Sequence, residues 1–448
     1  MGKISRVTLA MMLVVSPLLL GSNRAIFWAL NGTLSAIAIL FFVISELRDT
    51  KHGIKNWILP WKLLRLFALP AIWMGLQLLP GVPPFLAHPV WLSVPDAAAR
   101  ITINPHQTAL ALLWWLSMAV VFVAMQAGTR RGGSRWFLHL MMSMVLLVAV
   151  FGLANMFFGW NSLGIVIKTA YLDWLTGTFV NRNTAASFFV IGLSIATILG
   201  IEAYDRVCRS FDRASPIALA LHVLNSTVPL YLSIALVIFI ATLQTGSRAG
   251  IATALIALTI NFILTTRKRG SGRYFAFTAV IVCLMFLAVA TNALYERSNE
   301  AADSSWTRVE LAWEAWEAIK ARPLLGHGAG TYQSVEPIFH AIGTPSQVVW
   351  NHAHNSFLEA AVDLGIPMTI GLLVFAVALL LQLRRACLAA KKLMPATIAL
   401  FSVLSAESLH ALVDFSLQTQ AIALYVACLL GLAVGEVMTV HRDENFKI

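Results

Sequence analysis

The feature that most constrains this chain is a series of apolar runs, each long enough to cross a lipid bilayer. A helix needs about 20 apolar residues to span the bilayer core, and twelve segments meet this requirement. They lie near 4–21, 25–45, 60–80, 107–127, 136–158, 183–201, 222–243, 249–266, 273–292, 354–382, 396–415 and 418–438. Only 12% of the 448 residues are charged, about half the share of a soluble domain. The sequence therefore predicts an all-α, polytopic integral membrane protein with about 12 transmembrane helices, forming a single transmembrane domain over residues 1–448.

The placement of Lys and Arg predicts the orientation of these helices. If the N-terminus is cytoplasmic, 23 of the 32 basic residues fall on inner loops, as the positive-inside rule requires. We therefore expect cytoplasmic N- and C-termini and a retained first helix, since no cleavage site follows Lys3 and Arg6. The net charge of +11 then lies against anionic membrane lipids, and we expect no nucleic-acid partner.

One large outer loop, 293–353, is predicted between the ninth and tenth helices, and it contains a helical segment near 304–321. Apolar side chains repeat there at helical spacing, namely Trp306, Val309, Trp313 and Trp316. Acidic side chains form another face, namely Glu310, Glu314 and Glu317. Because an acidic face is poorly suited to anionic lipid, we expect this short amphipathic helix to dock onto the membrane bundle.

The end of this loop, Asn351–Glu359, concentrates polar groups where the apolar sequence resumes. Desolvating such groups at a membrane boundary is costly, which makes them functional candidates. His354 is a candidate general base because an imidazole titrates near neutral pH. Asn355 and Glu359 are candidates to orient it, with His352 in support. The alternative is a His–Asn pair that only caps a helix. No third ligand follows at a suitable spacing, so we expect no metal here.

Two outer arginines, Arg182 and Arg248, each fall at the start of a predicted helix. They lie in the glycine- and asparagine-containing segments Gly177–Asn183 and Gln244–Gly250. A guanidinium beside free backbone N–H groups is a good receptor for phosphate. Two such sites on one side of the membrane suit a diphosphate. The alternative is that each arginine only extends to the lipid headgroups.

Two further polar positions are supporting candidates. His327 lies in the glycine-rich segment Gly326–Gly330, which resembles a phosphate loop but lacks its lysine, and a flexible turn is the alternative. Asp414 follows His410 by one helical turn at the outer end of the eleventh predicted helix. A buried ion pair without a chemical role is the alternative for these two residues.

Together these segments resemble the O-antigen ligase and Wzy-type polymerase superfamily of bacterial envelope glycosyltransferases. The matching pieces are Ile101–Leu110, Gly177–Asn183, Thr245–Ile251, Arg322–Gly328, Ala353–Gly365 and His410–Phe415. The family signature of His, then Asn or Ser, nine residues and Gly fits His354, Asn355 and Gly365. Met368 departs from the small or aromatic residue that usually follows.

The resemblance implies a periplasmic active site on the bacterial inner membrane, with no metal or nucleotide cofactor. It implies a glycan donor on undecaprenyl diphosphate and a saccharide acceptor on lipid A-core or on another lipid-linked glycan. In this resemblance His354 corresponds to the family's essential histidine, and Arg182 and Arg248 to its diphosphate-binding arginines. An O-antigen ligase and a polymerase of O-antigen or exopolysaccharide repeat units both remain open.

A membrane transporter or flippase is a further alternative, because twelve helices suit that architecture. A transporter needs a site near the bilayer midplane that both sides can reach. Here the helices hold almost no central charges, apart from Glu407, and the polar motifs gather on one side. The sequence therefore favours the enzyme.

Overall fold

The computed structural model describes residues 3–48, 61–129, 134–211, 213–266, 300–340, 350–390 and 392–443. The regular secondary structure of these residues is helical, apart from one isolated β-bridge between Ser162 and Ile167, which confirms the predicted all-α class. The helices are α1 (Lys3–Leu18), α2 (Ala25–Arg48), α3 (Trp61–Leu78), α4 (Pro105–Thr129), α5 (Ser134–Phe158), α6 (Arg182–Ser210), α7 (Pro216–Leu224), α8 (Val228–Gln244), α9 (Arg248–Thr266), α11 (Glu300–Ala321), α12 (Tyr332–Phe339), α13 (Ser356–Leu364), α14 (Ile366–Ala389), α15 (Pro395–His410) and α16 (Gln420–Asp443). Short 3-10 helices are η1 (Leu20–Ser22), η3 (Pro89–Ser93) and η4 (Ser416–Gln418).

Seven described helices are long and apolar enough to cross a membrane: α2, α4, α5, α6, α9, α14 and α16. The bent pair α7 and α8, with an angle of 64° between them, makes an eighth candidate. The shorter apolar helices Ile4–Leu18 and Leu64–Leu78 lie within α1 and α3. A multi-pass membrane architecture is therefore confirmed. The count of twelve stays a prediction, and the expected helix at 273–292 lies outside the described residues.

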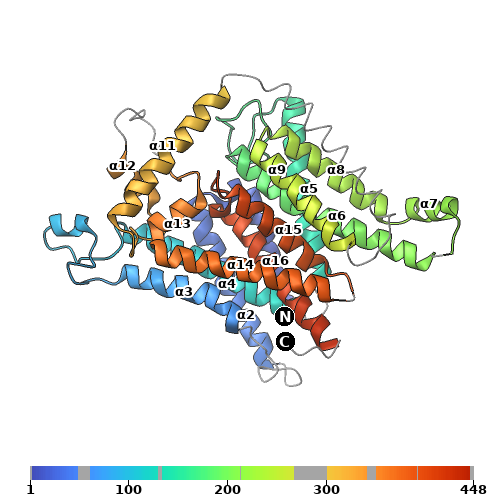
Figure 1. Ribbon diagram of the computed structural model, residues 1–448, viewed down its shortest axis with the longest axis horizontal. Helices are drawn as coiled ribbons and strands as arrows, with labels where there is room; N and C mark the ends of the chain where they lie inside the picture. The colour runs from blue at the N-terminus through green and yellow to red at the C-terminus, as the bar shows by residue number, and fades with distance from the viewer. Residues whose placement is uncertain are drawn as a thin grey trace.

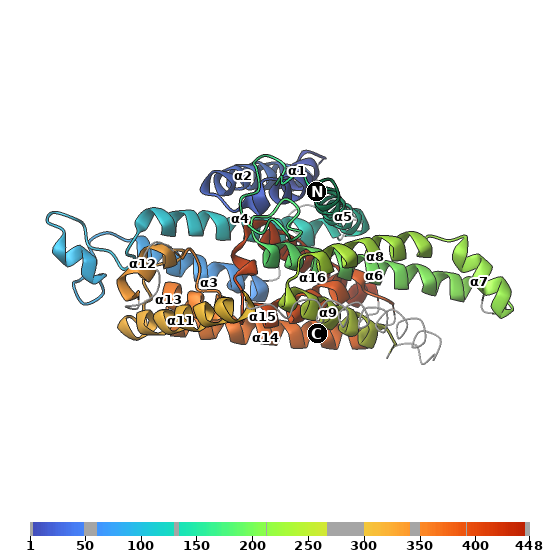
Figure 2. The ribbon, with the colours of Figure 1, turned by 90° about the horizontal axis from the view of Figure 1, so that it is seen from above.

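Helix α6 forms the centre of the bundle, because its apolar stretch is buried along its whole length. It packs against α5, α8, α9 and α15. A second close pair is α4 with α16, where a Cβ at Gly431 would lie only 2.5 Å from the Phe122 carbonyl oxygen. Figure 2 shows the resulting layers, with α1 and α2 on one side, α11 and α14 on the other, and α16 between them.

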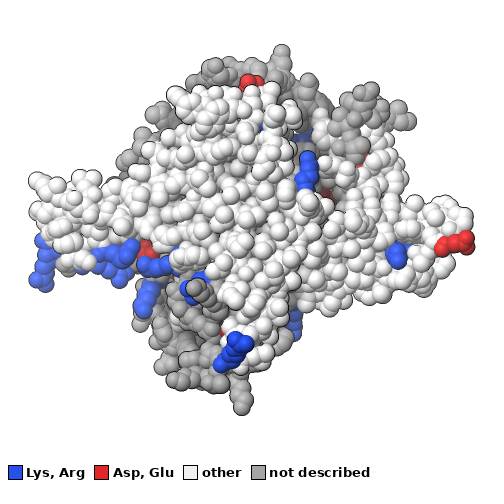
Figure 3. Space-filling view, turned by 180° about the vertical axis from the view of Figure 1, so that it is seen from behind, with Lys and Arg blue, Asp and Glu red and all other residues white. Residues whose placement is uncertain are grey.

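The outer surface of the bundle is strongly apolar. Only 11% of the residues in the apolar stretch of α14 are buried. Figure 3 shows a back face that is white over most of its breadth, with most Lys and Arg side chains towards its lower half. A broad uncharged surface on a chain of this composition suits contact with lipid acyl chains.

The tenth predicted helix is broken in two at Gly365, where α13 ends and α14 begins. Gly365 has a φ of +82°, and a Cβ there would lie 2.4 Å from the Leu324 carbonyl oxygen. Glycine is required because only it combines this backbone conformation with so close an approach. The break separates the polar helix α13 from the apolar helix α14.

Helix α11 contains the amphipathic segment that was predicted near 304–321. It packs against α12 and α13 through its small and aliphatic residues Leu311, Ala315, Ala318 and Ile319. Trp313 and Trp316 are 66% and 45% exposed, whereas Glu314 is buried. The exposed tryptophans are therefore not the docking face, because the smaller residues allow the closer helix contact. In Figure 1, α11 and α12 lie at the upper left, and α2 and α16 end near the lower edge.

Candidate active site

The start of α6 places three polar side chains at the surface of the bundle. Asn181 is the N-cap, and its side chain accepts a hydrogen bond from the Asn183 backbone N–H at 2.7 Å. This cap satisfies one of the amides that a helix leaves unpaired at its N-terminus. Asn183 is then turned inward, and its Nδ2 donates to Asp414 Oδ1 at 3.3 Å. The Asn-Arg-Asn sequence thus joins the start of α6 to the loop after α15.

Arg182 rests on aromatic rings of the preceding loop. Its guanidinium carbon lies 4.9 Å from the Trp174 ring centroid and 5.7 Å from that of Tyr171. Contacts of this kind hold the cation in place while its N–H groups stay available. The side chain is only partly buried, so the structure presents the guanidinium at the surface.

Arg248 lies at the start of α9, on a turn that packs against the same tryptophan. A Cβ at Gly246 would lie 2.3 Å from Trp174 ring atoms, and the Leu175 N–H donates to the Gln244 carbonyl at 2.9 Å. The predicted arginine segments therefore share one wall of the site, with Trp174 between them.

His354 adopts a backbone conformation that is unusual for a residue with a side chain. Its φ is +50°, in the left-handed region that costs most residues about 1 kcal/mol or more. Its ring meets Phe415 edge-on at 4.9 Å and Trp350 edge-on at 5.8 Å. Strain of this type often marks a functional position, and here the two aromatic rings fix the direction of the imidazole.

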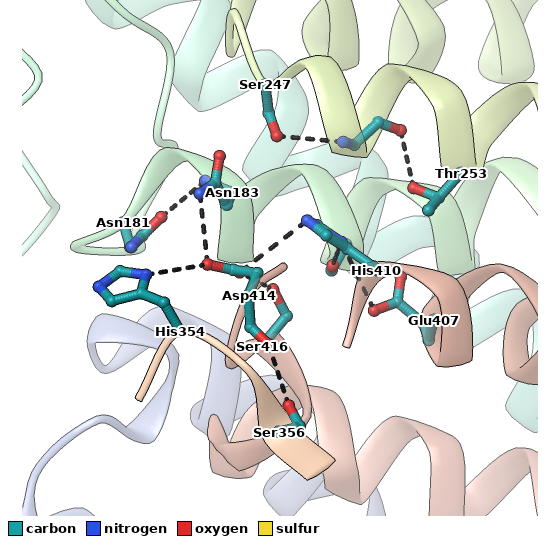
Figure 4. Close-up of polar contacts among 12 residues, drawn as sticks. Asn181, Asn183, Ser247, Thr253, His354, Ser356, Glu407, His410, Asp414 and Ser416 are labelled. Atoms are coloured by element: carbon teal, nitrogen blue, oxygen red, sulfur yellow. Dashed lines mark hydrogen bonds and ion pairs between the residues drawn. The ribbon is translucent and has the colours of Figure 1, made fainter. Parts of the chain in front are cut away.

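The Nδ1 atom of His354 lies 3.7 Å from Asp414 Oδ1. Figure 4 shows this nitrogen facing the carboxylate while the other ring nitrogen points away from it. Asp414 is fully buried, and Ser416 Oγ donates to its Oδ2 at 2.5 Å. Burial by itself raises the pKa of Asp414, but His354, His410 and Ser416 outweigh it and lower the pKa below its usual value. The ionised carboxylate therefore favours a proton on Nδ1 of His354.

The network continues behind Asp414 into the bundle. His410 Nε2 lies 3.9 Å from Asp414 Oδ2, and its Nδ1 lies 2.7 Å from Ser187 Oγ and 3.9 Å from Glu407 Oε2. The expected proximity of His410 and Asp414 is present. Since Asp414 also faces His354, this pair is connected to the site rather than isolated.

Hydrogen bonds tie the His354 loop to the loop after α15. Asn355 caps α13 by accepting from the Phe357 and Leu358 N–H groups at 3.0 and 3.1 Å. Its Nδ2 donates to the Leu412 carbonyl. Ser356 Oγ donates to the Asp414 carbonyl at 3.0 Å. The capping that was the alternative for this motif is therefore present at Asn355, and the predicted role of Asn355 in orienting His354 stays a prediction.

Glu359, which was predicted to orient His354, contacts His352 and Ala353 instead. Glu359 lies on α13 with its carboxylate turned to His352 Nδ1 and the Ala353 N–H, both at 2.9 Å. His352 in turn stacks on the Phe415 ring at 4.3 Å. Burial disfavours its charged form, yet Glu359 raises the pKa of His352 above its usual value. This pair supports Phe415, and through it the ring of His354.

His327 lies in a different environment. Its Nδ1 is 2.9 Å from His88 Nε2, and its Nε2 is 2.9 Å from the Ala318 carbonyl oxygen. Burial is the main cause that lowers the pKa of His327 to about 4. The glycines around it form a tight turn whose Gly330 N–H donates to Asp363 Oδ2 at 2.7 Å. The structure therefore places His327 in a neutral, buried contact between loops, and not beside His354.

Reasoning from the sequence missed three contributors to this site: Asn183, Ser416 and Trp174. Asn183 could have been found from its position directly after Arg182, since a second asparagine there is not needed for capping. Ser416 lies two residues after Asp414 and Trp174 eight residues before Arg182, but neither of them stands in a recognisable sequence motif.

Comparison with known proteins agrees with the resemblance that the motifs show. The O-antigen ligase family model matches residues 233–376, a segment that contains Arg248, His354 and Gly365. The chain is thus similar to O-antigen ligases over α9 and the polar helices α11 to α13. No curated protein matches the chain. The match supports a function of O-antigen ligase or polymerase type.

Proposed function

We propose that this protein transfers a glycan from undecaprenyl diphosphate to a saccharide hydroxyl at the periplasmic face of the bacterial inner membrane, as an O-antigen ligase with lipid A-core as acceptor. One observation carries the proposal. Asp414 contacts both His354 and Asn183, and so joins the candidate base to the helix start that bears Arg182. A base beside an anion receptor is what transfer from a diphosphate requires.

The donor half of the site is formed by Arg182 and Arg248. Cleavage of the glycosyl bond leaves negative charge on the diphosphate. Two guanidinium groups at helix N-termini stabilise that charge, and they do so most strongly where water is excluded. Trp174 packs against the Arg182 guanidinium and against Gly246 in the turn before Arg248. In this proposal the leaving group is already activated, so neither a metal nor a nucleotide takes part.

The acceptor half is formed by His354. The attacking hydroxyl loses its proton as the new bond forms, and the His354 nitrogen that faces away from Asp414 accepts it. Asp414 holds the ring and stabilises the imidazolium, as carboxylates do in catalytic triads. A single in-line displacement inverts the anomeric carbon of the donor sugar. Anomeric analysis showing retention would contradict this mechanism.

A Wzy-type polymerase is the second candidate, because it uses the same donor chemistry on a lipid-linked acceptor. The exposed Trp313 and Trp316 on α11 lie on the large outer loop, where an acceptor glycan would be bound. Sugar rings pack well on exposed aromatic rings, but the acceptors of a ligase and of a polymerase both contain sugar rings. The distinction therefore depends on experiment.

The test is deletion of the gene, with surface and lipid-linked glycans extracted and sized on a gel. The deletion strain is complemented with the wild-type protein or with His354→Gln at equal membrane abundance. Long chains accumulating on the lipid carrier, with none on lipid A, identify a ligase. Single repeat units in place of long chains identify a polymerase. In both cases we expect His354→Gln to fail to complement.

An unchanged glycan pattern in the deletion strain, together with full activity of His354→Gln in a purified assay, would contradict the proposal. A direct transport assay with a labelled lipid-linked glycan would then test the transporter alternative. The purified assay also covers the case of a redundant enzyme in the cell, since it does not depend on the strain.

A further inference from the structure

Three potential metal ligands meet between α11 and α12, away from the His354 site. Glu314 lies on α11, Glu336 on α12, and His340 directly after α12. One ligand atom from each lies within 4.8 Å of the other two. His340 Nδ1 is 2.8 Å from Glu336 Oε1 and 3.6 Å from Glu314 Oε1. The imidazole nitrogen therefore faces both carboxylates at once.

This cluster lies in an unusual concentration of buried negative charge. The side chains of Glu314 and Glu336 are each only 2% exposed. Two carboxylates so close together repel each other, and a positive charge placed between them attracts both. A divalent cation or a protonated imidazole can supply that charge.

A second observation comes from Tyr332. This residue precedes Glu336 by four positions, so the two share one face of α12, and His340 follows directly after the helix. The Tyr332 side chain is 2% exposed, and its hydroxyl has no hydrogen-bond partner among the described residues. Burial and the charges of Glu359, Glu314 and Glu336 raise the pKa of that hydroxyl. A buried donor beside carboxylates is therefore left to bond to something further, such as a metal-bound water.

We propose that Glu314, Glu336 and His340 bind one divalent cation of the Zn²⁺ or Mn²⁺ class, which joins α11 to α12. Two carboxylates and one imidazole are a ligand set that zinc accepts, with a water completing the coordination. Zinc bonds of about 2.1 Å in tetrahedral geometry place neighbouring ligand atoms roughly 3.4 Å apart. The separations of 2.8 and 3.6 Å lie on either side of that value, so small side-chain shifts suffice.

The cation has a structural role that is separate from glycosyl transfer. Helix α11 packs on α13, and α13 begins at Ser356, directly after the His354 loop. Fixing α11 to α12 therefore fixes the platform on which α13 lies. His340 is 20% exposed, and this partial exposure leaves a path for the ion to enter. The alternative is a proton shared between His340 and Glu336 with no metal bound.

The test uses the full-length, tag-free protein in detergent, stripped with a chelator. Zn²⁺ and Mn²⁺ are added separately, and bound metal is measured by mass spectrometry and by competition with a chromophoric chelator. The variants are Glu314→Gln and His340→Gln. The matched control is Glu310→Gln, which removes an exposed carboxylate one turn earlier on the same helix. Thermal unfolding with and without metal gives a second measurement that does not depend on activity.

We expect one bound ion per chain for the wild type and for Glu310→Gln, with a rise in Tm on adding metal. Glu314→Gln and His340→Gln should weaken binding by about tenfold or more and lose the rise in Tm. Without metal, Glu314→Gln should unfold no earlier than the wild type, because it relieves repulsion between carboxylates, and this shows that the variant folds. No binding to the wild type at micromolar metal, or equal binding by all four proteins, would overturn the proposal.

Discussion

Asp414 Oδ1 lies 3.7 Å from His354 Nδ1 although the two residues come from separate loops. The Asp414 carboxylate is buried, hydrogen-bonded to Ser416 and Asn183, and kept ionised by its neighbours. The distance is longer than a hydrogen bond, so the contact is that of two facing groups. A pair arranged in this way can stabilise an imidazolium that forms during proton transfer.

The first prediction concerns Asp414→Asn, which keeps the size of the side chain and removes its charge. We expect the rate of glycosyl transfer to fall by about 100-fold or more, since the proton acceptor loses its support. The measurement is the transfer rate with purified enzyme as a function of pH. Ser416→Ala is the matched comparison, because it removes a hydrogen bond to the same carboxylate and leaves its charge. Equal rates for Asp414→Asn and wild type would rule out the role of Asp414.

The second prediction separates the chemistry of His354 from the strain of its backbone. His354→Asn and His354→Ala should both lose transfer activity. Asn tolerates a φ of +50° better than Ala does, so the Asn variant should be more stable than the Ala variant by about 1 kcal/mol. Thermal unfolding of the two variants in detergent measures the difference. If the Ala variant is the more stable, the positive φ is not a source of strain.

The third prediction concerns Arg182 and Arg248 as the diphosphate receptor. Arg182→Gln and Arg248→Gln should each raise the KM for the lipid-linked donor. The rise should be about tenfold or more, because each substitution removes a charged contact to phosphate. Arg24→Gln is the matched control, since Arg24 is an exposed outer arginine with no place in the site. A KM that responds equally to all three substitutions would indicate a general effect of surface charge instead.

The fourth prediction is the pH dependence of stability that follows from the two buried histidines. Burial, reinforced by neighbouring charge, lowers the pKa of His88 to about 3, and burial lowers that of His327 to about 4. Between pH 6.5 and about 4 the unfolded chain gains protons on these residues and the folded chain does not. The free energy of unfolding therefore decreases as the pH falls through this range. The decrease due to His327 is up to about 3 kcal/mol.

The measurement is Tm in detergent at intervals between pH 7 and pH 4. His327→Gln should show a shallower fall in Tm than the wild type, because glutamine keeps hydrogen-bonding groups and does not titrate. His106→Gln, at an exposed histidine, should follow the wild type. A steeper fall for His327→Gln would mean that His327 is charged in the folded protein.

Much of the fold and part of the site follow from local sequence. Apolar runs define most of the helices, and the membrane class is confirmed. The helix starts at Arg182 and Arg248 were predicted, because capping groups and glycines act within a few residues. The cap at Asn355 was the alternative interpretation of its motif, and it was open to prediction because capping is also a local feature. The break at Gly365 matches the family signature, and its cause is local backbone conformation together with one close contact to Leu324.

The helix α11 shows where such reasoning fails. Its tryptophans and its small residues both repeat at helical spacing, and periodicity alone favours the larger apolar surface as the buried face. The structure buries the smaller residues, because the adjacent helices approach closely there. Glu314 is thereby buried beside Glu336 and His340, a cluster that sequence spacing did not indicate.

The sequence by itself determined that this chain is helical and multi-pass, because hydrophobicity and helix capping are local properties. Only the tertiary structure decided that Asp414 meets His354 and Asn183, that Glu359 turns to His352, and that His327 pairs with His88. These partners lie up to 239 residues apart in the chain. Their meeting depends on how helices pack, and packing is a property of the whole bundle rather than of any one segment.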